Sequence, residues 1–190
     1  MRVALTFDAE HPSRPTARPG VQDAVLALLR ERAVRATFFI QGRWATAYPA
    51  LARAIVADGH LIGSHSHFHA RLPLLTDEGL RVDVAHAEAA IIAACGTTPR
   101  PWFRAPYGDV DGRVLGVLGE LGYRHVGWDV IADDWEEGRT GDDVARTVLD
   151  GVRDDVVVVL HTWPGPALDA LPRILDGLAG ADLVTVADVL

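Results

Sequence analysis

The chain has 190 residues, of which 49% are hydrophobic and 23% charged, a composition typical of a soluble globular protein with a sizeable core. The formal net charge is -8 and every one of the 18 basic side chains is an arginine, so nothing favours nucleic acid or an anionic membrane as a partner. The single cysteine, Cys95, excludes an intramolecular disulfide. We expect residues 1–190 to form one domain.

The N-terminal segment has none of the three parts of a secretory signal: the charged start, the long apolar run and the small-residue cleavage site. No apolar stretch reaches the length of a membrane span. The sequence as written therefore predicts a cytoplasmic protein. It predicts no particular oligomeric state.

Apolar periodicity predicts strands and helices that alternate along the chain. Thr76 has the position of an N-cap residue, directly before the longest predicted helix. A polar loop is expected over 129–135. In chain order the predicted elements are a strand over 2–7, a helix over 21–32, a strand over 36–40, a helix over about 45–58, a strand over 60–63, a helix over 77–94, a strand over 102–104, a helix over 111–121, a strand over 123–128, a helix over 142–152, a strand over 156–160, a helix over about 167–178 and a strand over 183–186.

This alternation is the pattern of βα units around a parallel sheet, in either a barrel or an open sheet. Polar residues favour the barrel, because they stand at or just after the ends of several predicted strands, where barrels build their active sites. We therefore predict an α/β fold, a distorted (β/α) barrel with about seven parallel strands. The residues in question are Asp8, His65, Arg104, Asp134 and His161.

Histidines are concentrated at one strand end, since four of the eight in the chain fall between positions 60 and 69. His65 and His69 share a face if the loop begins a helical turn, and two neutral imidazoles suit zinc, cobalt, nickel or iron. A solvated polar loop without a ligand is the alternative. We assign His60 to the start of a strand and His67 to the surface or to a supporting position.

Two carboxylates, Asp8 and Glu10, follow the first predicted strand. A metal site with two histidines usually includes a carboxylate, and a second carboxylate can act as general base on a metal-bound water. Acidic residues after a strand are also common without any ligand, so the spacing alone leaves both interpretations open.

His161 follows a run of four valines and a leucine. It is either a satisfied residue at the edge of the core or a general acid, which Asp134 could orient. Arg104 lies among residues that look buried, and a buried arginine needs a carboxylate partner. Asp8 is the natural candidate for that partner.

Five short segments along the chain form a recognisable series. They are Thr6-Phe7-Asp8, the run from Gly63 to His69, the run from Phe103 to Gly108, Trp128 with Asp134-Trp135, and Leu160-His161. In this order they resemble the motifs of the polysaccharide deacetylases of carbohydrate esterase family 4, and the resemblance covers nearly the whole chain. One motif would be a weak match, whereas five in the family's order are specific.

The resemblance implies a role for each matching residue. Asp8 would be the catalytic base and His161 the catalytic acid, with His65 and His69 as metal ligands. Arg104 would orient the base, and the backbone at Tyr107 would help to form the oxyanion hole. The fourth and fifth motifs would supply Asp134 and the substrate contacts Trp128, Trp135 and Leu160.

One departure from the family concerns the metal. The family's first motif usually has two adjacent aspartates, the second of which binds the metal, but here that position is Ala9. Glu10 lies one residue further on, and we expect its longer side chain to supply the carboxylate. Without it, the metal would depend on two histidines and water, and binding would be weak.

The function implied is metal-assisted removal of acetyl groups, N- or O-linked, from a carbohydrate such as an N-acetylglucosamine-containing glycan or acetylated xylan. The expected cofactor is a divalent metal, zinc first, with cobalt or nickel as alternatives. Two other functions stay open: hydrolysis of a small non-sugar amide on the same fold, and glycan binding by a weakly active relative.

Overall fold

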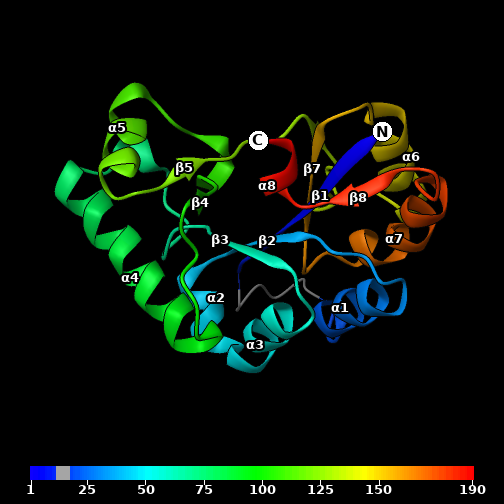
Figure 1. The fold of residues 1–190 in the computed structure, drawn as a ribbon, viewed down its shortest axis with the longest axis horizontal. Coiled ribbons are helices and arrows are strands. Elements are labelled where there is room, and N and C mark those ends of the chain that lie inside the picture. Colours follow the sequence, from blue (N-terminus) through cyan, green and yellow to red (C-terminus); the bar gives the residue numbers. More distant parts are fainter. Residues whose placement is uncertain (12–17) are drawn as a thin grey trace.

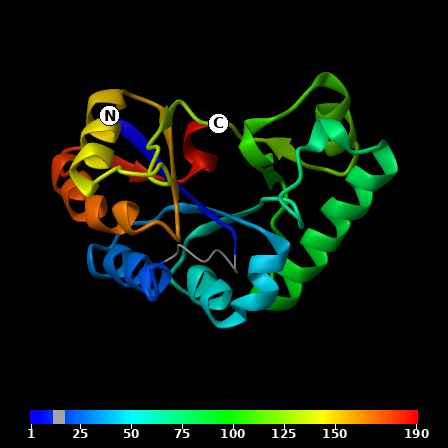
Figure 2. The ribbon, with the colours of Figure 1, turned by 180° about the vertical axis from the view of Figure 1, so that it is seen from behind.

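A parallel sheet of eight strands forms the centre of the computed structural model, which describes residues 1–11 and 18–190 (Figures 1 and 2). Seven strands follow one another in the order β5-β4-β3-β2-β1-β7-β6, and β8 pairs in parallel with the first residues of β1. The strands are β1 (Arg2–Ala9), β2 (Thr37–Ile40), β3 (Leu61–Ser64), β4 (Trp102–Phe103), β5 (Arg124–His125), β6 (Val130–Ile131), β7 (Val156–His161) and β8 (Asp182–Val184).

The sheet curls on itself because its two edge strands, β5 and β6, follow each other in the chain. The backbone from His125 to Val130 has five residue steps, which span at most about 18 Å when fully extended. The two edges must therefore lie near each other, although within the described residues no ladder joins them. The prediction of a distorted barrel with about seven parallel strands is confirmed.

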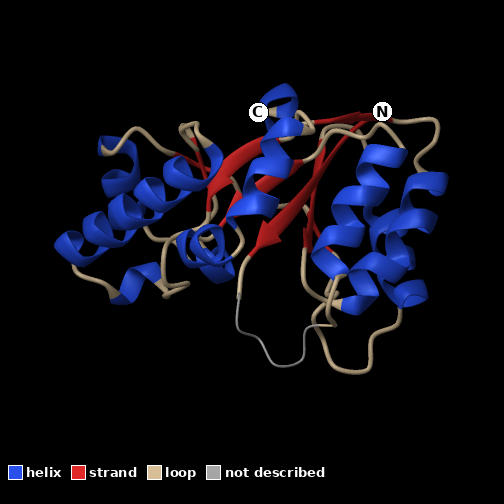
Figure 3. Ribbon diagram, turned by 90° about the horizontal axis from the view of Figure 1, so that it is seen from below, coloured by secondary structure: helices blue, strands red, loops and turns tan. Residues whose placement is uncertain are grey.

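Helices cover the outer face of the curled sheet, which leaves the strands on the inside (Figure 3). Thr76 caps the longest helix as predicted, since its side chain accepts a hydrogen bond from the N–H of Gly79. The helices are α1 (Val21–Glu31), α2 (Gly42–Ala47), α3 (Pro49–Ala57), α4 (Asp77–Cys95), α5 (Gly112–Glu120), α6 (Gly141–Gly151), α7 (Gly165–Gly177) and α8 (Val186–Val189), with short 3-10 helices η1 (Leu72–Leu74) and η2 (Pro106–Gly108).

Alternation along β1 separates two apolar regions. Its odd-numbered residues, such as Leu5 and Phe7, pack in the core between the sheet and the helices. Its even-numbered residues point into the curled sheet, where Ala4 belongs to a second apolar cluster with Val186 of α8. Asp8, near the C-terminal end of β1, also points into this interior, where it is in register with Phe39 of the cluster.

Four predicted elements differ from the structure in kind, number or extent. The helix over 45–58 is two helices, because Tyr48 precedes Pro49 and leaves the helical conformation (φ -127°, ψ 57°). The strand over 123–128 is only two residues long, and the predicted loop over 129–135 contributes Val130 and Ile131, which pair with β7. The strand over 183–186 ends at Val184, and α8 begins at Val186.

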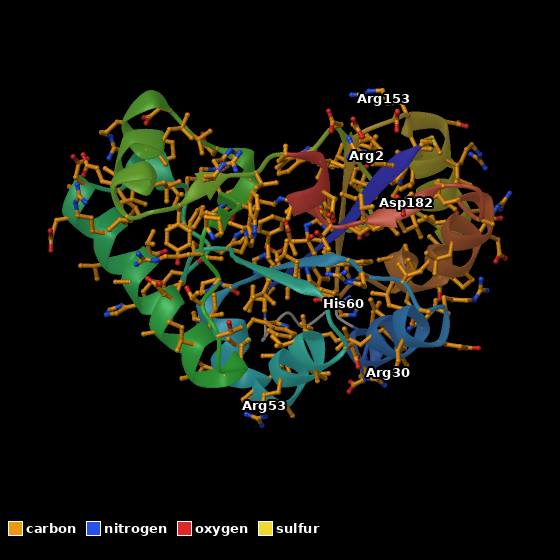
Figure 4. All side chains as sticks on the ribbon, viewed as in Figure 1. Arg2, Arg30, Arg53, His60, Arg153 and Asp182 are labelled. Carbon is orange, nitrogen blue, oxygen red and sulfur yellow. The ribbon has the colours of Figure 1, made fainter. Side chains whose placement is uncertain are left out.

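The outer surface carries many exposed arginine–carboxylate pairs. Figure 4 shows Arg2 and Asp182 at the start of β1 and β8, where the two residues are in register. The carboxylate to which Arg2 donates is that of Asp155, at 2.6 Å, and both of these side chains are about half exposed. Such pairs contribute at most about 1 kcal/mol each. None of the helices in the described part of the chain has the length and apolar character needed to cross a membrane.

Candidate metal centre and catalytic site

The two carboxylates after the first strand point into the same space. Asp8 is in β1 and Glu10 follows directly after its last residue, Ala9. Side chains two residues apart along extended backbone point the same way, so both carboxylates face the interior, and both are 3% exposed. Ala9 lies between them, on the opposite face, where it packs in the core with the helices. A side chain at position 9 therefore points away from the interior and cannot bind a metal there, whereas the side chain at position 10 points into it.

The loop after β3 brings two imidazoles to Glu10. Nε2 of His65 lies 3.2 Å and Nε2 of His69 2.5 Å from Oε2 of Glu10. One ligand atom from each of the three side chains lies within 4.8 Å of the other two. Among the described residues, no other group of three His, Cys, Asp or Glu side chains meets this condition. The structure brings Glu10 together with the two histidines, as a shared metal site would require, and its role as a ligand stays a prediction.

The donor chemistry of this set fits a divalent metal. The Nδ1 of His65 lies 2.8 Å from the backbone oxygen of Arg104, a contact that requires Nδ1 to carry a proton and leaves Nε2 as the nitrogen that faces Glu10. Burial lowers the pKa of His65, but Asp8 and Glu10 outweigh it and raise the pKa, so a metal at Nε2 would take the place of a proton. Burial lowers the pKa of His69, which favours the neutral form that binds metals. Two nitrogens and one carboxylate oxygen are the ligand set of many zinc sites that leave a position open for water.

Glu10 is held on its other oxygen as well. The Nε1–H of Trp163 donates to Oε1 at 3.2 Å, and Nε2 of His11 also lies 3.2 Å from it. Burial alone would raise the pKa of Glu10, but hydrogen bonds from His11, His65 and His69 outweigh it and hold the pKa well below its ordinary value. Glu10 is therefore ionised at neutral pH.

Arg104 pairs with Asp8, as predicted. Its Nη1 lies 3.0 Å from Oδ1 of Asp8 and also donates to the hydroxyl of Thr6 at 2.7 Å. Its other nitrogens donate to the carbonyls of Val126 and Gly127, in the segment that joins the two sheet edges. The fully buried guanidinium thus spans the interior of the sheet and fixes one oxygen of Asp8. The other oxygen, Oδ2, lies 3.8 Å from Nε2 of His65.

His161 and Asp134 form the second buried pair. Oδ1 of Asp134 lies 2.7 Å from Nδ1 of His161, and Oδ2 accepts the backbone N–H of the same histidine at 2.7 Å. Burial opposes the charged imidazole, but Asp134 outweighs it and, together with Glu10 and Asp8, raises the pKa of His161 to about 9. The imidazole is therefore protonated at neutral pH, with Nε2 on the side of Glu10, 3.8 Å from Oε1.

These groups line one cavity of about 340 Å³. Strand pairing explains why they meet, because Asp8 of β1 is in register with His161 of β7. Arg104 and Asp134 lie behind the cavity, each bound to a residue that lines it. The lining residues are Asp8, Glu10, His11, His65, His69, Tyr107, Trp128, Ile131, Trp135, Val159, His161 and Trp163.

Of the four residues that the resemblance placed beside the substrate or the oxyanion, three line the cavity. Tyr107 has a left-handed backbone (φ 61°), and its ring packs on His69. Trp128 forms part of the wall, and Trp135 lies 4.9 Å from the ring of His161. Leu160 does not contact the cavity. It points to the opposite face of β7 from His161 and is fully buried in the helix-side core, so this placement does not support the predicted contact with substrate.

Sequence reasoning missed His11 and Trp163, both of which line the cavity and contact Glu10. For Trp163, the position two residues after His161, the spacing that returns to the same face of a strand, was an available signal. His67, expected at the surface or in a supporting position, has its ring next to that of His86, outside the cavity.

Comparisons with known proteins agree with this arrangement. Residues 1–126 match a family model described as Polysaccharide deacetylase. A chitooligosaccharide deacetylase of Azorhizobium caulinodans is 35% identical over 178 residues, which cover 93% of this chain and 81% of the relative. A peptidoglycan-N-acetylglucosamine deacetylase of Bacillus cereus is 30% identical, and the match covers 97% of this chain but 66% of the relative. The solved structure of a family 4 carbohydrate esterase from Streptomyces lividans, in complex with acetate, has a TM-score of 0.85 and 31% identity, and covers 96% of this chain and 91% of that one.

Proposed function

Because the chain belongs to the polysaccharide deacetylase family, we propose that it is a metal-dependent hydrolase that removes acetyl groups from an acetylated carbohydrate. The observation that carries the proposal is the convergence, in one cavity, of the Glu10–His65–His69 set with a buried base and a buried acid. The names of the relatives favour N-acetylated oligosaccharides or peptidoglycan as substrates.

We assign Glu10, His65 and His69 to a divalent metal, with zinc first and cobalt or nickel as alternatives. When bound, such an ion polarises an acyl oxygen and makes a coordinated water more acidic. The three side chains belong to segments fixed by strand pairing or buried hydrogen bonds, so the ligand set is largely formed before any ion binds.

Asp8 is the proposed base. Arg104 occupies its Oδ1, so Oδ2, on the side of the histidines, is the oxygen available to accept a proton from the attacking water. Arg104 also fixes the orientation of the carboxylate. The backbone N–H of Tyr107 is the proposed donor to the oxyanion.

His161 is the proposed acid. Asp134 binds its Nδ1 and raises its pKa, so the proton on Nε2 is available for the leaving amine or alcohol. The base and the acid are on neighbouring paired strands, β1 and β7, with the cavity between them. Trp128 and Trp135 offer aromatic faces on which a sugar ring can stack.

The test is acetate release by the purified protein from N-acetylated chitooligosaccharides and from acetylated xylan, with and without a chelator, together with metal analysis. We expect about one bound ion per chain, release of acetate, loss of activity with the chelator and recovery when zinc, cobalt or nickel is added back. Bound metal without acetate from either sugar would favour the small-amide hydrolase. Neither metal nor acetate would favour a glycan-binding relative.

A further inference from the structure

A buried aspartate outside the catalytic set contacts the loop between the two metal histidines. Asp83 lies on α4 and is 4% exposed. It belongs neither to the pair of Asp8 and Arg104 nor to the pair of His161 and Asp134. We propose that Asp83 is a positioning residue, which holds His69 in place for metal binding. This inference rests on the metal site proposed above.

Both oxygens of Asp83 accept hydrogen bonds from consecutive backbone amides of that loop. Oδ2 accepts the N–H of His67 at 2.8 Å, and Oδ1 accepts the N–H of Phe68 at 3.1 Å. A buried carboxylate is costly unless such bonds satisfy it, and bonds to an ionised acceptor are stronger than those between neutral groups. Asp83 therefore fixes two successive peptide units between the ligands.

His65 does not depend on these bonds. Its backbone N–H donates to the carbonyl of Ile40 at 2.9 Å, and its ring is bound through Nδ1 to Arg104 at 2.8 Å. It also follows directly on β3, which is paired on both sides. Its position is set by the sheet.

His69 is held far less directly. Its backbone N–H donates to the hydroxyl of Ser66 at 3.0 Å, while its Nδ1 is buried without a hydrogen-bond partner among the described residues. Its ring can meet Glu10 only if residues 66–68 keep their path. The position of this ligand therefore depends on the loop.

The path of the loop is strained at both ends. Ser66 has φ 58° and His69 has φ 60°, left-handed values that are unfavourable for residues other than glycine and persist where surrounding contacts hold them. Two bonds hold the strained residues themselves: the Gly42 N–H donates to the carbonyl of Ser66 at 2.9 Å, and the His69 N–H donates to the hydroxyl of Ser66. The bonds to Asp83 hold the two residues between them. Without them the loop can relax, and His69 would leave Glu10.

A purely structural role would make a different prediction. If Asp83 only joins α4 to the loop, its loss lowers stability and affects metal binding equally whether or not His69 is present. A positioning role acts through His69, so the effect on metal affinity should disappear once that ligand has been removed. A double-mutant cycle separates the two.

The experiment measures the Kd for Co²⁺, by its absorption spectrum, in wild type, Asp83→Asn, His69→Ala and the double variant. Asparagine keeps the shape of the side chain, but its amide nitrogen cannot accept a hydrogen bond. Glu88→Gln is the matched control, because Glu88 is on the same helix and its carboxylate binds Arg100 at 2.6 Å, outside the site.

We expect Asp83→Asn to weaken Co²⁺ binding by about 10- to 100-fold, as loss of a supporting contact typically does. Glu88→Gln should leave the Kd unchanged, and in the His69→Ala background Asp83→Asn should change it by less than about twofold. A wild-type Kd in Asp83→Asn, or the same loss in both backgrounds, would overturn the proposal.

Amide hydrogen exchange of the metal-free wild type tests the same idea without a variant. The amides of His67 and Phe68 should be protected although they lie in a loop, because Asp83 binds both. Exchange at the rate of unstructured chain would contradict the proposal. A wild type that binds no Co²⁺ would contradict the proposed function, while the exchange rates would still decide whether Asp83 holds the loop.

Discussion

Replacement of Arg104 by methionine should destabilise the fold far more than the loss of any surface arginine. The guanidinium is fully buried, and its partner Asp8 is 3% exposed. In Arg104→Met the methionine fills part of the space, but Asp8 is left as a buried carboxylate without its cation. The carbonyls of Val126 and Gly127 also lose a donor.

The size of the effect follows from this burial. Removal of one partner of a buried ion pair costs about 3–5 kcal/mol in free energy of unfolding. For a chain of this size, each kcal/mol shifts the melting temperature by about 2–4 °C, which gives a fall of roughly 6–20 °C. A second substitution, Asp8→Asn, removes the unpaired charge and should recover part of the loss.

Urea and thermal unfolding of the variants measure the effect. Arg113→Met is the matched control, because Arg113 pairs with Asp77 at 2.7 Å but the two side chains are 36% and 57% exposed. That control should lose at most about 1 kcal/mol. If Arg104→Met were no less stable than Arg113→Met, the view that a buried ion pair holds Asp8 across the interior would be wrong.

The acid–base pair gives two further predictions. Since His161 must be protonated to act as an acid, activity should fall as the pH rises through its pKa of about 9. Asp134→Asn removes the carboxylate that raises this pKa, so the alkaline fall should begin at lower pH; an unchanged pH–rate profile would contradict the pairing. Asp8→Asn and His161→Ala should each lower kcat by about 10²- to 10⁴-fold while the circular dichroism spectrum stays that of a folded chain. Near-normal turnover in either variant would remove that residue from its role.

Most of the fold could be predicted from local patterns. The four valines before Leu160 form a strand that is buried on both faces, and the apolar helix faces have the expected period. Helices α2 and α3 are separate because Pro49 begins α3. The proline is a local signal for this break, but the apolar periodicity over 45–58 favoured a single helix. The pairing of Val130 and Ile131 with β7 could not be foreseen, because a two-residue strand depends on a partner that lies distant in the chain.

The candidate site was predictable where residues stand at strand ends. Alternation also explains where two residues on β7 and just beyond it lie. Leu160, a predicted substrate contact, points to the core, whereas Trp163, which was missed, lies beside the cavity. The contact between His11 and Glu10 depends on the backbone of His11 itself, which has φ 50°. No local pattern predicts that conformation for a histidine.

The most direct test of the central claim is the metal affinity of Glu10→Ala. The alternation of β1 turns Glu10, rather than Ala9, toward His65 and His69, so this one carboxylate should complete the site. Calorimetric titration of the metal-free protein with Zn²⁺ should give about one site per chain, and Glu10→Ala should bind more than about 100-fold more weakly. Glu78→Ala, which removes an exposed glutamate at the start of α4, should bind like wild type. An unchanged affinity in Glu10→Ala would contradict the account.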